Sequence, residues 1–240
     1  MIAVIGEASP RVEDRKFLTG AGKYLDDLEF PDVCHAVFIR SPHAHARILS
    51  LSAAIAKEMP GVLDIITADD VELSKLNALK PFVQENPNTG EAFSFVEQPL
   101  LARNVVRYQG EPIVLVVAET VAQALDASEV VEIEYSPLPH VVDGKEAAST
   151  DSIKLNSQLD ENIAVKWNTG NSQEIENVLN SADNVVKLTV QNQRIVTNPM
   201  EPRGVVAEWN ISTGRYTLYG SSQNIHVMRT CVADMLGVAE

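Results

Sequence analysis

The apolar run from Ile113 to Ala118 is the sequence feature that most constrains the fold. Its six residues are Ile-Val-Leu-Val-Val-Ala, with no polar residue in alternation. A half-buried strand alternates apolar and polar residues, whereas a strand covered on both faces does not. The run therefore predicts a strand buried on both faces, and other elements of the chain must cover it.

Further strands and short helices are expected around this run. Thr120 should cap a helix, with Gln123 at the capping-box position and an inner face made of Val121, Ala124, Leu125 and Ser128. Ser52 should cap a shorter helix over residues 53–59. The other expected strands are Val33–Arg40, which resumes at Ile48–Leu51 after a break, Val62–Thr67 and Val130–Tyr135. Two strand–helix–strand units result.

Residues 77–99 and the segments after residue 143 have sequence patterns different from those of the expected strands and helices around Ile113–Ala118. Residues 77–99 hold three prolines and few periodic apolar residues, which indicates a long functional or partner-facing loop. Residues 144–162 are polar and predict a linker, and residues 172–180 predict a short amphipathic helix. Residues 184–197 alternate apolar and polar side chains, which predicts a long antiparallel strand.

The C-terminal stretch predicts two strands and then a helix. Val205–Trp209 and Arg215–Tyr219 flank a turn, and apolar residues recur at helical spacing from Asn224 to Leu236, before Gly237. Gln223 should therefore lie at the start of the last helix. Helix N-termini carry unpaired N–H groups and partial positive charge, so they suit anionic ligands.

Charge and cysteine content exclude several classes of protein. The chain has 19 Lys and Arg against 33 Asp and Glu, a net charge of −14, which disfavours nucleic acid and anionic membranes. The N-terminus shows no signal peptide, and no stretch approaches a membrane span. Cys34 and Cys231 form no CxxC pattern, so a disulfide framework, a zinc site and a cysteine-ligated cluster lack support. We expect a cytoplasmic protein.

Several polar groups admit a structural and a functional interpretation. His43 and His45 could share a metal, but no third ligand is evident, and local packing in a turn explains them better. The acidic pairs at 26–27, 69–70 and 132/134 suit helix caps or solvated faces. Glu201 and Arg203 suit a structural ion pair or a place near a cofactor.

Five stretches together resemble a known family. They are Arg11–Asp14 with Leu18–Asp27, Arg40–Ile48, Pro60–Val62, Val106–Ala118 and Asn198–Arg229. In this order they are similar to the N-terminal part of the molybdenum-binding large subunit of the xanthine dehydrogenase, aldehyde oxidase and carbon monoxide dehydrogenase family. The last stretch is the most specific.

The resemblance implies an α+β fold. It places an N-terminal arm at residues 1–16, an α/β hammerhead domain at 17–143, a linker at 144–183 and the beginning of a molybdopterin-binding domain at 184–240. It also implies a molybdenum–molybdopterin cofactor, most simply in its cytosine dinucleotide form. The implied partners are an iron–sulfur small subunit with [2Fe–2S] clusters, an FAD-carrying medium subunit and a second large subunit.

The resemblance also assigns the site residues. Gln223 corresponds to the family's glutamine beside the molybdenum, with Ser222 and Asn224 as its neighbours in the cofactor-binding segment. The family's glycine-rich Gly-Gly-Phe-Gly segment and its catalytic glutamate have no counterpart in these 240 residues. We therefore expect a piece of a longer subunit or a split-gene product, with no catalytic residue of its own and no activity alone.

A second hypothesis is a stand-alone interaction module built on the hammerhead scaffold, without catalysis. The gene sequence beyond codon 240 would distinguish the two. The substrate is not determined by these residues, because in the family the residues that select it lie largely outside this region.

Overall fold

The structure is a computed structural model that describes residues 6, 8, 10–81, 83–167, 170–193, 195–199, 201 and 203–240. The chain divides into two units, each made of two separate stretches. The first unit contains Met1–Asp32 and Leu188–Gln223, and the second contains Val33–Lys187 and Asn224–Glu240. The domain limits expected from the sequence stay a prediction.

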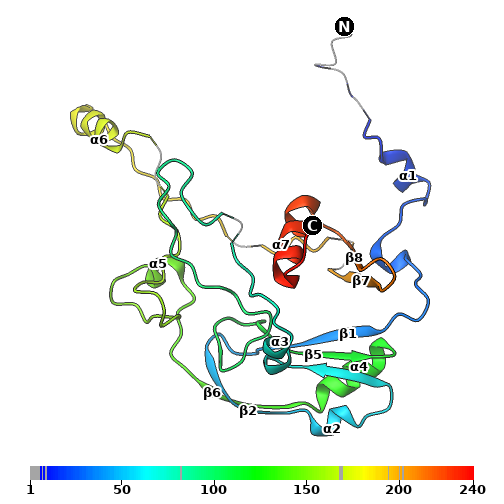
Figure 1. Ribbon diagram of the computed structural model, residues 1–240. Coiled ribbons are helices and arrows are strands. Elements are labelled where there is room, and N and C mark those ends of the chain that lie inside the picture. Colours follow the sequence, from blue (N-terminus) through cyan, green and yellow to red (C-terminus); the bar gives the residue numbers. More distant parts are fainter. Residues whose placement is uncertain are drawn as a thin grey trace. The chain divides into compact units, whose positions relative to one another are not determined.

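The second unit is organised around strand β5 (Pro112–Ala118). β5 pairs antiparallel with β1 (His35–Arg40) on one edge and with β3 (Val62–Ile66) on the other (Figure 1). Four side chains of β5 are completely buried, those of Ile113, Val114, Val116 and Ala118. The prediction of a strand covered on both faces is confirmed in part, because Val114, Val116 and Ala118 share one buried face, whereas Leu115 and Val117, on the face of Ile113, are half-buried.

A second sheet of the same unit has the order β4-β2-β6, again antiparallel. It consists of β4 (Val105–Val106), β2 (Ala46–Ser52) and β6 (Glu132–Pro137). The expectation that residues 48–51 resume the first strand was wrong, because β2 lies in a different sheet from β1. At the intervening turn the Ser41 Oγ accepts the N–H of His43 at 3.0 Å, and the chain changes direction there.

Helix α4 (Val121–Glu129) packs against β1 and β5 (Figure 1). Thr120 caps it as predicted, accepting the Gln123 N–H at 3.3 Å. The predicted inner face was partly wrong, since Val121 and Leu125 are half exposed and Ala124 and Ala127 are completely buried. Small side chains on this face allow the helix backbone to approach the sheet closely.

Two shorter helices complete this part of the unit. α2 (Ala54–Lys57) follows Ala53, which occupies its N-cap without a side-chain hydrogen bond, so the predicted Ser52 cap was wrong. Ser52 is the last residue of β2 and belongs to the sheet ladder. α3 (Ala68–Leu73) has a capping box between Thr67 and Asp70.

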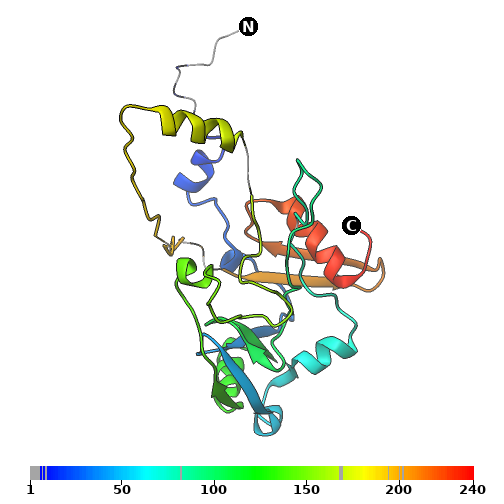
Figure 2. The ribbon, with the colours of Figure 1, turned by 90° about the vertical axis from the view of Figure 1, so that its left-hand side faces the viewer.

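The long segments between these elements carry local structure. Leu79 pairs with Gln98, and Glu85 with Ala92, within the predicted long loop. The polar 144–162 segment contains α5 (Gly144–Ala147), and the Asn162 side chain donates to the carbonyls of Ala147 and Ile153 at 3.1 and 2.7 Å. The predicted amphipathic helix is α6 (Ser172–Ser181), drawn in yellow in Figure 2.

Helix α7 (Ile225–Leu236) ends as predicted at Gly237, which has a φ of +66°. The N–H groups of Gly237 and Val238 donate to the carbonyls of Asp234 and Ala233. Asn77 donates its backbone N–H to the Met235 carbonyl at 2.9 Å and its side-chain amide to that of Asp234 at 2.6 Å. The carbonyls at the helix end therefore have partners.

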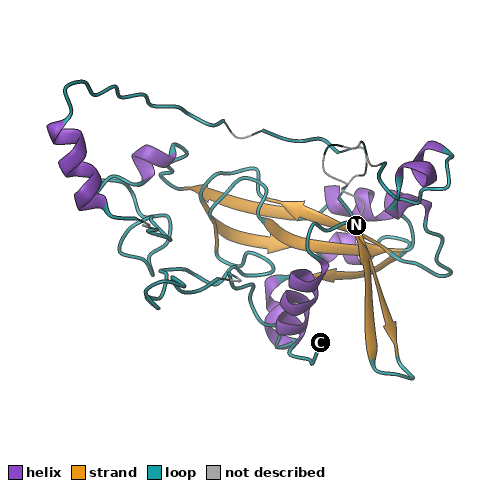
Figure 3. Ribbon diagram, turned by 90° about the horizontal axis from the view of Figure 1, so that it is seen from above, coloured by secondary structure: helices purple, strands orange, loops and turns teal. Residues whose placement is uncertain are grey.

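The first unit contains α1 (Asp14–Leu18), the 3₁₀ turn η1 (Leu25–Asp27) and a hairpin of β7 (Val205–Asn210) and β8 (Arg215–Gly220). The hairpin is a two-stranded ribbon, visible as a separate pair of strands in Figure 3. The rings of Phe30 and Tyr219 lie 4.9 Å apart and join the N-terminal segment to it.

The predicted strand over residues 184–197 was wrong for the residues that the structure describes, which contain no strand there. The apolar side chains of this segment, including Val186 and Leu188, are exposed. A strand needs a hydrogen-bonding neighbour, and no described strand pairs with this segment. In the described part of the chain no helix is long and apolar enough to cross a membrane.

The core can be tested with one residue type. Ile65 on β3 is 1% exposed, whereas Ile55 on α2 is 65% exposed. Ile65→Ala should lower the free energy of unfolding by about 2–5 kcal/mol, because it removes buried methyl groups and leaves a cavity. Ile55→Ala should change it by less than about 0.5 kcal/mol. Urea unfolding measures both, and equal losses would contradict the assignment of the core.

A buried carboxyl group lies immediately before β5. Glu111 is 4% exposed, and its carboxylate accepts the Arg107 backbone N–H at 2.5 Å. Burial raises the pKa of Glu111 above its ordinary value of 4.5, and the hydrogen bonds and charge of Arg107 oppose that shift only in part. The folded chain thus holds this proton at higher pH than the unfolded chain.

Stability contributed by protonated Glu111 should be complete below its ordinary pKa and lost as the pH rises through the folded-state pKa. Glu111→Gln keeps an acceptor for Arg107 and should abolish this component of the pH dependence, measured by urea unfolding across the acidic range. Glu134→Gln, on β6, leaves Glu111 in place and should keep the same pH dependence of stability as the unchanged chain.

Glu111→Ala should lower the free energy of unfolding by about 1–3 kcal/mol, since the Arg107 N–H loses its acceptor.

Candidate cofactor site

The segment between β8 and α7 holds the three residues singled out in the sequence. α7 begins at Ile225 and Asn224 is its N-cap, so Gln223 lies one residue before the cap, as expected. The Asn224 Oδ1 accepts the N–H of Val227 at 3.1 Å. Ser222, Gln223 and Asn224 are all exposed.

The hairpin register determines which segments lie near Gln223 within the first unit. Val205 pairs with Gly220, so the chain before β7 and the chain after β8 leave the same end of the hairpin. A Cβ added to Gly220 would lie 3.4 Å from the Gly204 carbonyl, which shows how closely the two segments approach. Arg203 and Gly204 therefore lie at the hairpin end from which Gln223 emerges.

Glu201 has a different partner from the one expected. The structure describes both Glu201 and Arg203, and these two residues form no ion pair with each other. The Glu201 Oε1 instead accepts the backbone N–H of Leu25 at 3.0 Å. The i and i+2 spacing put the two side chains on one face of an extended chain, but it could not reveal an acceptor role toward a residue 176 positions away. Leu25 was not singled out from the sequence as a partner of Glu201.

The donors of this segment fit an anionic, oxygen-rich group. The Gln223 carboxamide can donate two hydrogens, and the first turn of α7 contains no acidic residue. N–H groups in the first turn of a helix have no intrahelical acceptor, and the helix dipole favours negative charge there. The residues present can therefore contact one side of such a group.

The histidine pair packs locally. The His43 ring makes an edge contact with Tyr135, at 4.9 Å between ring centroids, and the His45 Nδ1 lies 2.6 Å from the Pro139 carbonyl oxygen. Across the described residues, no group of three or more His, Cys, Asp or Glu could hold a metal ion. The ring contact of His43 and the His45 contact with Pro139 are the local packing expected from the sequence.

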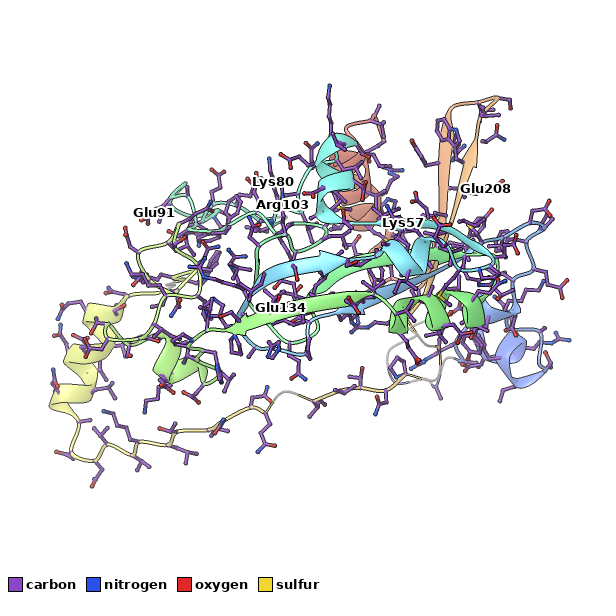
Figure 4. The ribbon with its side chains drawn as sticks, turned by 90° about the horizontal axis from the view of Figure 1, so that it is seen from below. Lys57, Lys80, Glu91, Arg103, Glu134 and Glu208 are labelled. Carbon is purple, nitrogen blue, oxygen red and sulfur yellow. The ribbon has the colours of Figure 1, made fainter. Side chains whose placement is uncertain are left out.

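The acidic pairs have structural partners. Asp27 accepts the Tyr24 N–H at 2.8 Å, and Glu134 on β6, labelled in Figure 4, accepts the Ser50 hydroxyl at 3.3 Å. A hydrogen bond from the Thr67 side chain lowers the pKa of Asp70, whose carboxylate accepts the Thr67 backbone N–H in the capping box of α3. Asp69 pairs with Arg103 at 2.8 Å.

Two surface depressions lie in the second unit, and neither is lined by Gln223. One, of about 600 Å³, is lined by residues of α2, α3 and Arg103, with Lys57 and Arg103 labelled in Figure 4. The other, of about 640 Å³, is lined by the 86–91 loop and by Lys166, Trp167 and Gly170. Neither collects a set of groups suited to acid–base or nucleophilic chemistry.

Comparison with known proteins identifies two family models along the chain. Residues 19–139 match the model described as aldehyde oxidase and xanthine dehydrogenase, a/b hammerhead domain. Residues 155–240 match the molybdopterin cofactor-binding domain.

Curated relatives match almost the whole chain. The nicotine 6-hydroxylase large subunit of Paenarthrobacter nicotinovorans is 35% identical, over 99% of this chain and 28% of that protein. The carbon monoxide dehydrogenase large chain of Afipia carboxidovorans is 31% identical, over 96% of this chain and 29% of that protein. The chain thus spans less than a third of the length of these relatives.

Solved structures of similar proteins match almost the whole chain as well. Quinoline 2-oxidoreductase from Pseudomonas putida matches with a TM-score of 0.84 and 33% identity, over 98% of this chain and 29% of that one. Carbon monoxide dehydrogenase from Oligotropha carboxidovorans matches with a TM-score of 0.82 and 31% identity, over 98% of this chain and 29% of that one.

The start of α7 can be tested through its cap. Asn224→Ala removes the acceptor for the Val227 N–H and should lower the free energy of unfolding by about 1 kcal/mol. Asn224→Asp keeps a side-chain oxygen and should restore most of the loss. Amide exchange at residues 225–227 should rise in the alanine variant alone. Unchanged exchange there would show that the helix start does not depend on this cap.

Proposed function

Because the chain belongs to the aldehyde oxidase and xanthine dehydrogenase family, we propose that it acts as the N-terminal part of a molybdenum hydroxylase large subunit. The observation that carries this proposal is the order of the two matches, a hammerhead domain followed by a molybdopterin cofactor-binding domain. The activities in the names of the relatives, nicotine 6-hydroxylase and carbon monoxide dehydrogenase, belong to those proteins.

The complete enzyme would oxidise a small substrate of the carbon monoxide, aldehyde or heterocycle type. When bound, the molybdenum–molybdopterin group, in its cytosine dinucleotide form, would supply two-electron redox chemistry with water as the oxygen source. Partner subunits would carry [2Fe–2S] clusters and FAD and accept the electrons, beside a second large subunit. The name of one relative, subunit gamma of a dehydrogenase complex, supports an assembly of several subunits.

Within this chain, Gln223 would donate a side-chain N–H to an anionic oxygen of that group. Its position one residue before the N-cap of α7, and the absence of acidic residues from the first turn, support this role. Ser222 and Asn224 would shape the same segment, with Asn224 holding the helix start through its bond to Val227.

The 240 residues alone would be inactive, because hydroxylation needs a base, a metal site and a substrate pocket together. Their contribution would be to hold one side of the cofactor and to contact partner subunits. A stand-alone hammerhead module without catalysis is the competing function. The match of residues 155–240 to a cofactor-binding domain favours the hydroxylase.

The test uses the complete large subunit assembled with its partners. Gln223→Ala should lower turnover on the order of 10²-fold, the effect of removing one placed hydrogen-bond donor, while molybdenum content stays at the wild-type level. Gln173→Ala on the exposed helix α6 is the matched control and should leave turnover unchanged. Wild-type turnover in the Gln223→Ala enzyme would show that Gln223 does not act in the site. Absence of molybdenum from the wild-type assembly would favour the module.

A further inference from the structure

We propose that the 3₁₀ turn Leu25–Asp27 is a clasp that positions Gln223, acting through Glu201 and Gly204. The proposal rests on the proposed function for the importance of Gln223, but it concerns contacts made by this chain alone. All of its residues lie in the first unit. Glu201 and Leu25 are positioning residues in this scheme, and neither contacts a substrate or cofactor.

The central contact joins two distant parts of the sequence. The Leu25 N–H donates to the Glu201 Oε1 at 3.0 Å in a partly buried setting. A hydrogen bond to a charged acceptor is stronger than a neutral one, and partial burial protects it from water. This bond therefore attaches the chain just before β7 to the N-terminal turn.

Two hydrogen bonds between Tyr24 and Asp27 hold the turn itself. The Asp27 carboxylate accepts the Tyr24 N–H at 2.8 Å, and the Asp27 N–H donates to the Tyr24 carbonyl at 3.0 Å. These two bonds form a small closed loop around Leu25. The Leu25 N–H is consequently presented in one direction, toward Glu201.

A side-chain contact accompanies the hydrogen bond. A Cβ added to Gly204 would lie 2.6 Å from the Leu25 Cδ2, so the leucine side chain occupies the space that any other residue at 204 would need. Glycine at this position therefore allows the turn to lie directly on the segment that enters β7.

The N-terminal segment also covers one face of the hairpin. Phe30 packs on Tyr219, and Tyr219 and its cross-strand neighbour Val206 on that face are half-buried. On the opposite face Trp209 and Tyr216 pair with each other, at 4.2 Å between ring centroids, and remain about half exposed. An isolated two-stranded hairpin is marginally stable in water, so this one-sided cover matters.

The clasp acts on Gln223 through the hairpin end. Residues 203–204 and 221–223 leave the same end, and Gly204 and Gly220 approach closely there. A displacement of Glu201 or Gly204 therefore moves the backbone that presents Gln223. The clasp also keeps the Glu201 carboxylate bonded to the Leu25 N–H.

The experiment uses the cofactor-free 240-residue chain labelled with nitrogen-15. The Gln223 side-chain NH₂ signals are assigned by their loss in Gln223→Glu. Glu201→Ala should shift or broaden these signals and raise amide exchange at Leu25 and residues 221–223 about tenfold, because one hydrogen bond is lost. Glu201→Gln retains an acceptor oxygen and should restore both readouts.

Arg203→Gln is the matched control, because Arg203, which the structure describes, forms no ion pair with Glu201 and its replacement leaves the Leu25–Glu201 hydrogen bond intact. It should leave the Gln223 signals and the exchange unchanged. Amides of β5 report on the second unit and should keep their protection in every variant. If Glu201→Ala unfolds the hairpin, Gly204→Ala provides the second test, and it should shift the Gln223 signals by displacing Leu25.

Unchanged Gln223 signals in both Glu201→Ala and Gly204→Ala would overturn the clasp, as would an equal effect of Arg203→Gln. Because these signals are read without cofactor, this outcome is independent of turnover. If the Gln223 signals respond as expected but the Gln223→Ala enzyme keeps wild-type turnover, the clasp stands and only the proposed role of Gln223 in the enzyme is contradicted.

Discussion

The burial of β5 is the constraint on which the rest of the second unit depends. A strand with completely buried side chains and both edges paired must have a neighbouring strand on each side and cover on both faces. β1 and β3 satisfy the edges, and α4 supplies cover through Ala124 and Ala127. The second sheet contributes Ala46 and Val106 to the same core, so the two sheets share one hydrophobic centre.

The two units differ in how they are stabilised. Within the described residues, every fully buried apolar side chain belongs to the second unit. The first unit relies instead on a few specific contacts, chiefly the Phe30–Tyr219 ring pair and the bond from Leu25 to Glu201. Since Gln223 ends the first unit, the candidate site depends on the part of the chain with the smaller core. Individual contacts therefore have more influence on it than a single contact has in the second unit.

Local signals in the sequence were sufficient where a short segment decides its own structure. The Thr120 cap, the Gly237 stop and the strand pair around the 211–214 turn each rest on residues a few positions apart. Predictions that required a distant partner were less successful. Residues 184–197 have the alternation of a strand, but alternation does not supply a paired neighbour. Likewise, Glu201 was matched to the nearest cation, whereas its partner is a backbone N–H from the N-terminal turn.

The sequence by itself determined the family, the α+β class and the place of Gln223 at the start of a helix. These follow from motifs, apolar periodicity and capping residues, which act over a few positions. Only the tertiary structure decided that β2 leaves the sheet of β1, that alanines rather than larger residues face that sheet, and that Leu25 holds Glu201. Each of these depends on which segments distant in the sequence lie next to each other in the fold. Local preferences, which act over a few residues, do not specify those contacts.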